Sequence, residues 1–543
     1  MIHRCSLAAL AALSLGACLG GPPPSTALVE RRAAYAGEDP GLQDFLLGDF
    51  QGLSREALDT FGVPWKVSCT ALLLFKNPGA VPFDEEGAVQ LLQRYGLYRP
   101  ARIANWPDPT PAPTLRRPLG TVTGMLVPAP GLRVEVSNNG CATCHAARGY
   151  DAEGNPTDEA WLGLSSTSVN YEAWAQDAFG ALEQLSRLPD DEVVKEVRRA
   201  FPRLDGDEER ALRWVVLPKL KERLRARAGT GRFVDFSGGL PGLTNGVATL
   251  KMLMGQPEPA GTPPALVSVP MLSGRELRTS HLWDGVYAPP GRPRTAAMTA
   301  ADVTPAHLDA MGAIPAVFTT GTLGIPPHMG AANVERTRRV FRASLRLQSP
   351  PFPGALDEGL LARGEGLFNT GCAGCHGTYD RATRPARLVR YPNQVTPQAE
   401  MGTDPMRWER VDATANAAFG ASAFGRFVDA RPTGGYVAPI LTGTWATAPY
   451  LHNGSVPTLE ALVNPEKRPR RFLLGGHKLD LRAVGIAAVP GDATRYPDGY
   501  VPWSVPVVYD TDLPGQGNDG HEDPFADLDE ADKRAIIEYL KAL

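Results

Sequence analysis

The sequence predicts a mainly helical fold with long irregular loops and few short strands, divided between two domains that carry the same motif. Three observations support this fold class. A chain of 543 residues is too long for a single hydrophobic core. Its 57 Gly and 51 Pro favour turns and long ordered loops over a compact helical bundle. The pentapeptide Cys-x-x-Cys-His occurs twice, at residues 141–145 and 372–376.

The repeated pentapeptide predicts two covalently bound c-type haems. Its two thiols add across the haem vinyl groups, and the adjacent histidine binds the iron from one side. The six residues concerned are Cys141, Cys144, His145, Cys372, Cys375 and His376. The alternative, a zinc knuckle or a redox dithiol, does not call for a histidine beside both cysteine pairs. We therefore expect two cytochrome c-like haem domains.

Composition and charge exclude some classes of partner. The chain is 43% hydrophobic and 21% charged, as a soluble globular protein is. Its formal net charge of −4 gives no reason to expect nucleic acid as a partner. No stretch is apolar for long enough to span a membrane, so any anchoring is expected to be by lipid.

The N-terminal residues predict export. A basic start is followed by an apolar segment, residues 7–17, that is too short to span a bilayer. Leu-Gly-Ala-Cys at 15–18 resembles a bacterial lipoprotein cleavage box, so residues 1–18 read as a lipoprotein signal peptide. Cys18 would then carry lipid, ahead of a flexible tether over 19–40, and Cys5 would leave with the signal. An ordinary signal peptide is the alternative. Either prediction places the protein on the periplasmic side or at the outer membrane.

A leading segment, residues 41–120, follows the tether and has no function that the sequence assigns. Helices are predicted at about 41–60 and 84–95, before a proline-rich run at 107–118. Cys69 has no partner for a disulfide once the other cysteines are assigned, so it is expected to be a buried thiol without chemistry.

The N-terminal haem domain is expected at 121–348. Ser-Asn-Asn-Gly at 137–140, just before the first haem motif, predicts a turn rather than a helix. The remaining predictions are helices at 171–186, at 190–227 with breaks at Pro202 and Gly206, and at 334–347, with a loop-rich segment at 235–300.

The C-terminal cytochrome c domain is expected at 354–543, after a proline-rich linker at 350–353. A helical run ends in Leu-Phe just before Cys372, and residues 527–543 predict an amphipathic helix with a capping-box start. Such a closing helix packs across the opening helix in small cytochromes c. Both ends of that fold are therefore expected here.

These features resemble the bacterial dihaem cytochrome c peroxidase and MauG superfamily. The C-terminal half is similar to the branch with dihaem rubber oxygenases, in Met-Gly-Thr-Asp-Pro at 401–405, in the segment 442–459 and in Gly-Asn-Asp-Gly-His-Glu at 517–522. The resemblance covers 354–543 well. It covers 120–345 only loosely, with Trp-Asp-Gly at 283–285 as the main similarity outside the haem motif.

The resemblance implies an exported dihaem oxidoreductase with two unlike haems. The C-terminal haem is expected to be six-coordinate and to relay electrons. The N-terminal haem, bound through His145, is expected to react with peroxide, as in cytochrome c peroxidases, or with dioxygen, as in rubber oxygenases. An apolar polymer and a small redox partner protein or electron donor are the implied partners. The alternative is a non-enzymatic dihaem electron carrier.

The distal ligands are less directly indicated than the proximal ones. His521, in a Gly/Asn-rich loop before the last helix, is expected to bind the C-terminal iron, with Met401, Met406 and His452 as alternatives. His452 is otherwise expected to lie near that haem and tune its potential, or to be a turn histidine bonded to backbone carbonyls. No distal ligand of the N-terminal haem is indicated, although His281, His307 and His328 are available.

Three further features have more than one interpretation. Trp283 and Trp445 are either electron relays between the haems or core residues. The basic run 467–471 could neutralise haem propionates, dock an acidic partner or form a solvated loop.

Overall fold

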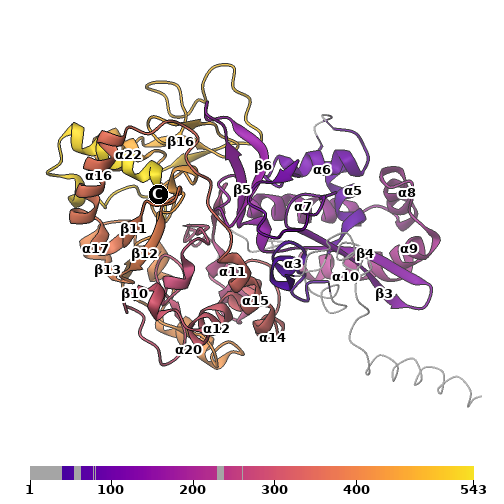
Figure 1. The fold of residues 1–543 in the computed structure, drawn as a ribbon. Coiled ribbons are helices and arrows are strands. Elements are labelled where there is room, and N and C mark those ends of the chain that lie inside the picture. Colours follow the sequence, from indigo (N-terminus) through magenta and orange to yellow (C-terminus); the bar gives the residue numbers. More distant parts are fainter. Residues whose placement is uncertain (1–38, 54–62, 78, 80, 229–237, 260) are drawn as a thin grey trace, which may run out of the picture.

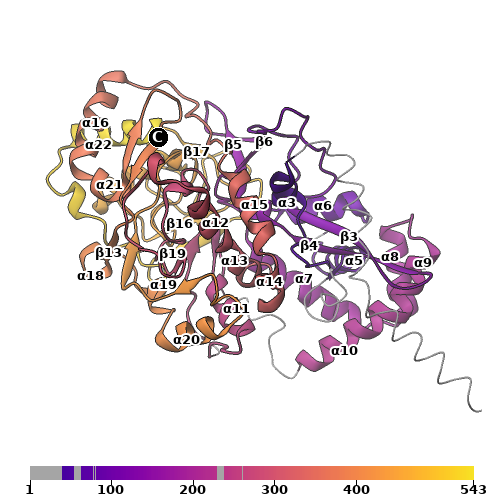
Figure 2. The same ribbon diagram turned by 60° about the horizontal axis from the view of Figure 1, so that its bottom comes forward.

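The computed structural model describes residues 39–53, 63–77, 79, 81–228, 238–259 and 261–543 (Figure 1). The predicted signal peptide with Cys18, nearly all of the tether and the end of the predicted 41–60 helix lie outside these residues. Figures 1 and 2 show the N-terminal half of the chain on one side and the C-terminal half on the other. Within the described ranges no helix is both long enough and apolar enough to cross a membrane.

The leading segment is part of the N-terminal core. Its elements are helices α3 (Pro40–Leu47), α5 (Trp65–Phe75) and α6 (Glu85–Gln93) and strands β1 (Val63–Pro64) and β2 (Arg102–Ile103). Helix α5 was not predicted, because it is buried on most of its sides and shows no alternation of polar and apolar residues. Cys69 of this helix is a buried free thiol, as expected.

The predicted turn at 137–140 is wrong. Strands β3 (Thr121–Ala129) and β4 (Leu132–Asn139) form an antiparallel hairpin, and β1 completes the sheet in the order β1-β4-β3. Asn138 and Asn139 resemble a turn by composition, but they pair with Val122 and Thr121 of β3. The ladder satisfies their backbone groups and carries the strand to the edge of the first haem motif.

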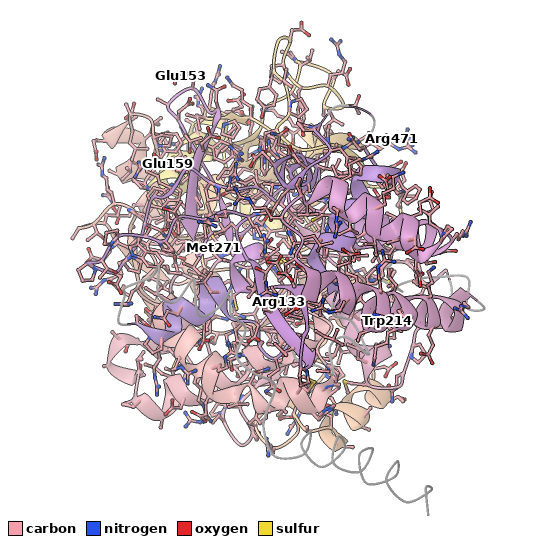
Figure 3. The ribbon with its side chains drawn as sticks, turned by 90° about the vertical axis from the view of Figure 1, so that its right-hand side faces the viewer. Arg133, Glu153, Glu159, Trp214, Met271 and Arg471 are labelled. Atoms are coloured by element: carbon pink, nitrogen blue, oxygen red, sulfur yellow. The ribbon has the colours of Figure 1, made fainter. Side chains whose placement is uncertain are left out.

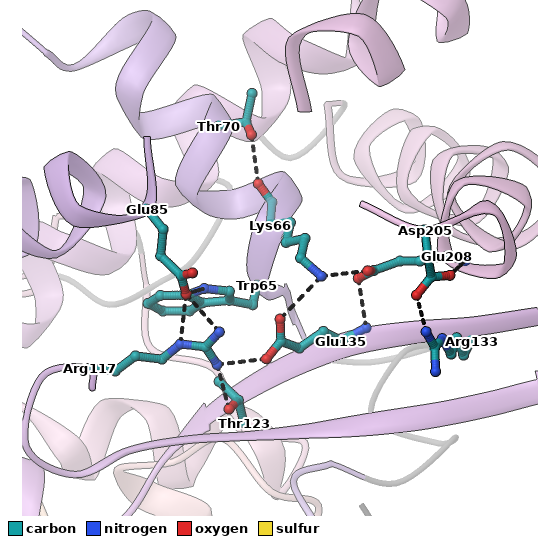
Figure 4. A network of polar contacts seen from close by, with 10 residues as sticks. All are labelled: Trp65, Lys66, Thr70, Glu85, Arg117, Thr123, Arg133, Glu135, Asp205 and Glu208. Atoms are coloured by element: carbon teal, nitrogen blue, oxygen red, sulfur yellow. Dashed lines mark hydrogen bonds and ion pairs between the residues drawn. The ribbon is translucent and has the colours of Figure 1, made fainter. Parts of the chain in front are cut away.

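A network of ion pairs with a buried centre joins the leading segment to this sheet (Figure 4). Lys66 of α5 pairs with Glu135 of β4 at 3.4 Å and with Glu208. Arg117 pairs with Glu135 at 2.7 Å and with Glu85 of α6 at 2.8 Å. Because each carboxylate in the buried centre has a cationic partner, the network specifies how these elements meet.

A helical layer covers this core. It consists of α7 (Tyr171–Ser186), α8 (Asp190–Ala200), α9 (Gly206–Ala211), a π-helical turn (Leu212–Val216) and α10 (Leu217–Ala228). The predicted helix at 171–186 and the predicted interruption between residues 200 and 206 are both confirmed. Asp205 caps α9 by accepting from the backbone of Asp207 and Glu208. Trp214 projects from the layer with 74% of its surface exposed (Figure 3).

The segment after α10 belongs to both halves of the chain. Its helices are α11 (Gly246–Leu253), α12 (Pro305–Ala313), α13 (Pro315–Gly321), α14 (Pro327–Ala332) and α15 (Val334–Ser344), and its strands are β7 (Leu243–Thr244), β8 (Val267–Ser268), β9 (Tyr287–Ala288) and β10 (Met298–Thr299). The basic helix α15 lies beside α3 (Figure 2), where Arg336 pairs with Asp44 at 2.9 Å.

Two sheets cross the expected boundary between residues 348 and 354. Strand β10 pairs with β12 (Arg387–Tyr391), and β9 pairs with β14 (Asp429–Ala430). The proline-rich linker therefore connects two halves that share sheets and core residues. The other C-terminal strands are β11 (Thr378–Asp380), β13 (Val395–Pro397), β15 (Gly435–Val437), β16 (Arg471–Leu474), β17 (Leu479–Asp480), β18 (Gly485–Ile486) and β19 (Val507–Asp510).

The opening and closing helices of the C-terminal half pack together, as expected from the sequence. Helix α16 (Glu358–Gly371) crosses α22 (Glu530–Ala542). Phe368 and Tyr539 place their ring centroids 5.0 Å apart at the crossing. A Cβ atom on Gly364 would lie 1.9 Å from the carbonyl oxygen of Ala535, so the close approach requires glycine. Smaller helices complete this half: α17 (Ala373–His376), α18 (Gln398–Met401), α19 (Met406–Glu409), α20 (Ala413–Ala421) and α21 (Leu459–Val463).

Two alanine substitutions on α16 are expected to change stability in opposite directions. Gly364→Ala should lower the free energy of unfolding by about 2–3 kcal/mol, because the new methyl group has no space against Ala535. Gly366→Ala should raise it by about 0.5–1 kcal/mol, because nothing lies within 4 Å of the added carbon. Urea unfolding of the haem-loaded proteins measures both. Equal changes in the free energy of unfolding at the two positions would contradict the close packing of α16 against α22 at Gly364.

Candidate haem sites

The two haem motifs occur in different local structures but orient their histidines in the same way. Cys372 caps α16, and the second motif continues into α17, whereas the first motif forms a 3-10 turn between β4 and β5 (Ala146–Tyr150). Strand β6 (Pro156–Leu162) then pairs with β5. The first motif is thus positioned by strands β4 and β5 on its two sides. It has no preceding helix, whereas α16 precedes the second motif.

Each motif histidine has its Nδ1 atom against a proline carbonyl. In His145 this atom lies 3.1 Å from the oxygen of Pro270, and in His376 it lies 3.0 Å from the oxygen of Pro439. A carbonyl accepts only, so Nδ1 carries the proton and Nε2 keeps its lone pair. Burial lowers the pKa of His145 to about 4 and lowers that of His376, which keeps both rings neutral. A neutral, oriented imidazole is what binding to haem iron needs.

His521 faces His376 across a space that fits one metal ion. The two ring centroids are 6.0 Å apart, with an angle of 73° between the rings. Two imidazoles that bind one metal through nitrogens at about 2.0–2.1 Å have centroids about 6 Å apart. His521 Nδ1 is buried without a partner among the described residues. Burial, with the neighbouring His376, lowers the pKa of His521 to about 4, so this ring is neutral as well.

The loop that presents His521 is held by the basic run 467–471. Arg468 donates to the carbonyls of Asn518 at 2.6 Å and Gly520 at 3.1 Å, and its side chain is 4% exposed. His521 itself has a left-handed backbone with φ of 55°. The other charges of the run pair at the surface: Lys467 with Glu460, Arg470 with Asp512, and Arg471 with Asp510. The basic run thus positions a loop, and its contacts give no support to a propionate site or an acidic partner.

The other expected ligands of the C-terminal iron have different surroundings, although Met401 and His452 line the same cavity as His376. The sulfur of Met406 accepts from Arg410 at 2.9 Å, and the carbonyl of Met401 accepts from the backbone of His521 at 2.8 Å. His452 stacks on Tyr436 with ring centroids 4.2 Å apart. Its Nε2 is buried without a partner among the described residues, so a histidine satisfied by carbonyls is not what the structure shows. His452 is a buried, neutral side chain beside the cavity, and burial lowers its pKa to about 3.

A cavity of about 650 Å³ joins these side chains. Cys375, His376, His521, His452 and Trp283 line it. Pro270, whose carbonyl accepts from His145, also lines it. Its size is that of a pocket for a small molecule or cofactor. The second site is therefore shaped to receive the haem that its motif predicts.

The two tryptophans differ in position. Trp283 lines the cavity, and its Nε1 donates to the carbonyl of Ser268 at 3.0 Å, two residues before Pro270. Trp445 is fully buried, bonds to the carbonyl of Pro350 at 3.1 Å and packs against Phe352. Trp283 thus lies at the cavity of the second motif and bonds to the segment that includes Pro270, whereas Trp445 has the surroundings of a core residue.

The histidines available for the N-terminal iron do not face His145. Nε2 of His281 lies 3.3 Å from the carbonyl of Met311, and Nε2 of His307 lies 2.9 Å from that of Glu276. His328 is exposed. In the part of the chain that the structure describes, the ring of His145 contacts no other aromatic ring, unlike that of His376.

Glu172 is a buried acid near the first motif that sequence reasoning missed. It accepts from Thr244 Oγ1 at 3.0 Å and from the backbone of Asn245 at 3.1 Å through one oxygen. Its other oxygen has no partner among the described residues. Burial raises the pKa of Glu172, and its charge is close enough to raise the pKa of the Cys144 thiol. The sequence held no signal for it, because one Glu in the first turn of a helix is ordinary.

Three other buried residues were also missed. Arg275 and Arg278 line the cavity. His477 stacks on Tyr150 with centroids 6.4 Å apart, and neither of its ring nitrogens has a partner among the described residues. All three sit in loops or short turns, where no periodicity marks a buried position.

The zinc-knuckle alternative finds no support in the donor geometry. A structural zinc needs four ligands in a tetrahedron. Over the described ranges, no group of three or more His, Cys, Asp and Glu side chains is arranged to hold a metal ion. The five described cysteines form no disulfide with one another.

One family model matches a segment of the C-terminal half. Residues 435–473 match a family model described as RoxA-like, cytochrome c-like, and this segment contains His452 and ends in β16. The match supports a c-type haem and a haem-based redox function for the chain. It covers only a small part of the C-terminal half.

Two uncharacterized proteins of Sinorhizobium fredii (strain NBRC 101917 / NGR234) are similar to this chain. The protein y4iM is 32% identical over 205 residues, which is 32% of this chain and 44% of y4iM. The protein y4iJ is 38% identical over 119 residues, which is 20% of this chain and 18% of y4iJ. The chain thus spans less than half the length of either relative.

Proposed function

We propose that the chain is an exported dihaem c-type oxidoreductase that reduces peroxide. Cys372, Cys375 and His376 hold a haem at an electron-relay site, and the motif at 141–145 holds a second haem at the reaction site. One observation carries this proposal. His376 has a second histidine at the distance for a shared iron, whereas His145 has none among the described residues. Bound haem supplies one-electron chemistry and, with an open iron position, cleavage of an O–O bond.

His376 and His521 would both bind the iron of the relay site and so saturate it. Both residues are oriented by hydrogen bonds: Nδ1 of His376 to Pro439, and the backbone of His521 to Met401. A site saturated in this way can change oxidation state but cannot bind a substrate. Trp283 and the segment from Ser268 to Pro270 form the connection along which we propose that electrons pass between the sites.

Glu172 supplies the proton chemistry that peroxide reduction needs. The overall step consumes one peroxide, two electrons and two protons and yields two waters. We propose that the carboxylate of Glu172 accepts a proton from peroxide and returns it to the leaving oxygen, through the oxygen that has no partner among the described residues. A buried group near the first motif with a raised pKa is suited to this exchange. This acid favours peroxide over oxygenation of an apolar polymer, which remains the alternative.

Location and partners complete the proposal. Covalent haem attachment suits a protein exported through the N-terminal signal and held by lipid at Cys18, with its electrons supplied by a small redox protein. The competing function, a carrier with two saturated irons, differs in one observable, the coordination of the iron at His145.

Electron paramagnetic resonance of the haem-loaded protein tests the proposal. After mass spectrometry has shown two haems per chain, we expect one low-spin and one high-spin ferric signal. The high-spin signal should respond to cyanide and be lost in His145→Gly, because that variant lacks the proximal ligand. His307→Gln, whose ring bonds to a carbonyl, should retain both signals. Two low-spin signals that survive half-reduction and ignore cyanide and peroxide would make the protein an electron carrier.

A further inference from the structure

Two buried arginines line the cavity that also holds Cys372, Cys375 and His376 in its wall. Arg275 is 6% exposed and Arg278 is 2% exposed, and both side chains reach the wall of the cavity. Among the described residues neither guanidinium forms an ion pair, although the structure contains many Arg–carboxylate pairs elsewhere, such as Arg407–Asp284 at 3.0 Å. Acidic residues also line the cavity, in the region of His521, and none of them pairs with either arginine.

The two arginines differ in how their nitrogens are used. Arg278 is held on all sides: Nε donates to the carbonyl of Ser280 at 3.1 Å, and its terminal nitrogens donate to the Tyr391 hydroxyl at 3.1 Å and the Leu282 carbonyl at 2.9 Å. Arg275 donates through Nε to the Met271 carbonyl at 2.6 Å. Its two terminal nitrogens make no hydrogen bond to a described residue.

A pair of buried cations without an anion is costly. Carbonyl oxygens satisfy hydrogen bonds but leave the charge uncompensated, and a buried ion normally has a partner of opposite charge. Burial and the neighbouring Arg278 lower the pKa of Arg275 to about 9, so the guanidinium remains charged at neutral pH. An anion at this position would offset both the free-energy cost of burying the charge and the repulsion between the two arginines.

We propose that Arg275, supported by the fixed charge of Arg278, binds a carboxylate inside the cavity. A planar guanidinium with two free terminal nitrogens matches the two oxygens of a carboxylate. The site lies between the two proximal histidines, because Met271 follows Pro270 beside His145 and Arg278 contacts Ala438 beside Pro439. A haem propionate is one source of the carboxylate, and this source rests on the proposed function. A free carboxylate ligand is the other.

The test uses haem-loaded protein with its propionates labelled by feeding 5-aminolevulinate that carries ¹³C in the carboxyl group. In Arg275→Gln we expect the equilibrium constant for reduction of at least one haem to fall tenfold or more, which is 59 mV for one electron. Loss of a nearby cation favours the oxidised, more positive haem. Arg275→Lys, which keeps the positive charge, should lower the reduction potential much less. Arg387→Gln, at an exposed site, should leave the reduction potential unchanged.

Infrared difference spectra between the oxidised and reduced states identify the carboxylate. If a propionate is bound, a ¹³C-sensitive carboxylate band moves in Arg275→Gln. If the ligand is free, no labelled band moves, and added formate shifts the wild-type potential but not that of the variant. The proposal is overturned if haem content is complete but neither the band nor the formate response depends on Arg275. Should Arg275→Gln not fold, the carboxylate band in Arg275→Lys decides, because lysine keeps the charge but loses the two-nitrogen contact and should shift the band of a bound carboxylate. Absence of attached haem would instead contradict the proposed function.

Discussion

A Glu172→Gln variant is expected to lose peroxide turnover by about 10²–10⁴-fold while keeping both haems. The amide has nearly the shape of the carboxyl and can still accept from Thr244 and Asn245, but it cannot take a proton from peroxide. Because burial raises the pKa of Glu172, the rate in the wild type should rise as pH increases through a value above that of an ordinary glutamate. This limb of the pH–rate profile should vanish in the variant.

Steady-state peroxide reduction with a reduced cytochrome as electron donor measures this effect. Glu183→Gln is the matched control, since it lies on the same helix α7 with its side chain 38% exposed and paired with Arg187. The control should keep its turnover and its pH profile. Normal turnover in Glu172→Gln would remove this residue from the proposed reaction. Unchanged oxygen consumption with an apolar polymer would then favour the oxygenase alternative.

A His521→Ala variant is expected to convert the C-terminal haem from low-spin to high-spin. The substitution removes the imidazole whose ring centroid lies 6.0 Å from that of His376. One iron position would then be open to water or cyanide. His521→Met should restore a six-coordinate iron and raise its potential, because a thioether ligand favours the reduced state. Optical and paramagnetic resonance spectra, followed by potentiometric titration, measure both changes.

His452→Ala provides the control for this assignment. Its ring is buried beside the cavity but stacks on Tyr436 instead of facing His376, so the low-spin signal should persist with an altered potential. A low-spin signal that survives in His521→Ala and disappears in His452→Ala or Met401→Ala would show that the sixth ligand has been misassigned.

Helix prediction succeeded where the pattern is local. Helices α7 and α22 show apolar residues at helical spacing and directly follow Asn170 and Asp529, whose side chains cap them. It failed for α5, which is buried on most sides, and for the end of β4, whose asparagines resemble a turn until β3 pairs with them. The division at residues 348–354 also depended on local composition, whereas strands β9 and β10 pair across it.

The sequence by itself determined the chemistry that the protein can carry. The predictions of haem attachment and of the proximal histidines rest on five consecutive residues, and the prediction for the loop of His521 rests on its composition and resemblance. Only the tertiary structure decided which groups meet. It brings His521 to His376, leaves His145 without such a neighbour among the described residues, and buries Glu172 and Arg275 near the motifs. A sequence motif shows which residues are close along the chain. Metal coordination and charge compensation depend instead on distances in space between residues that are far apart in sequence.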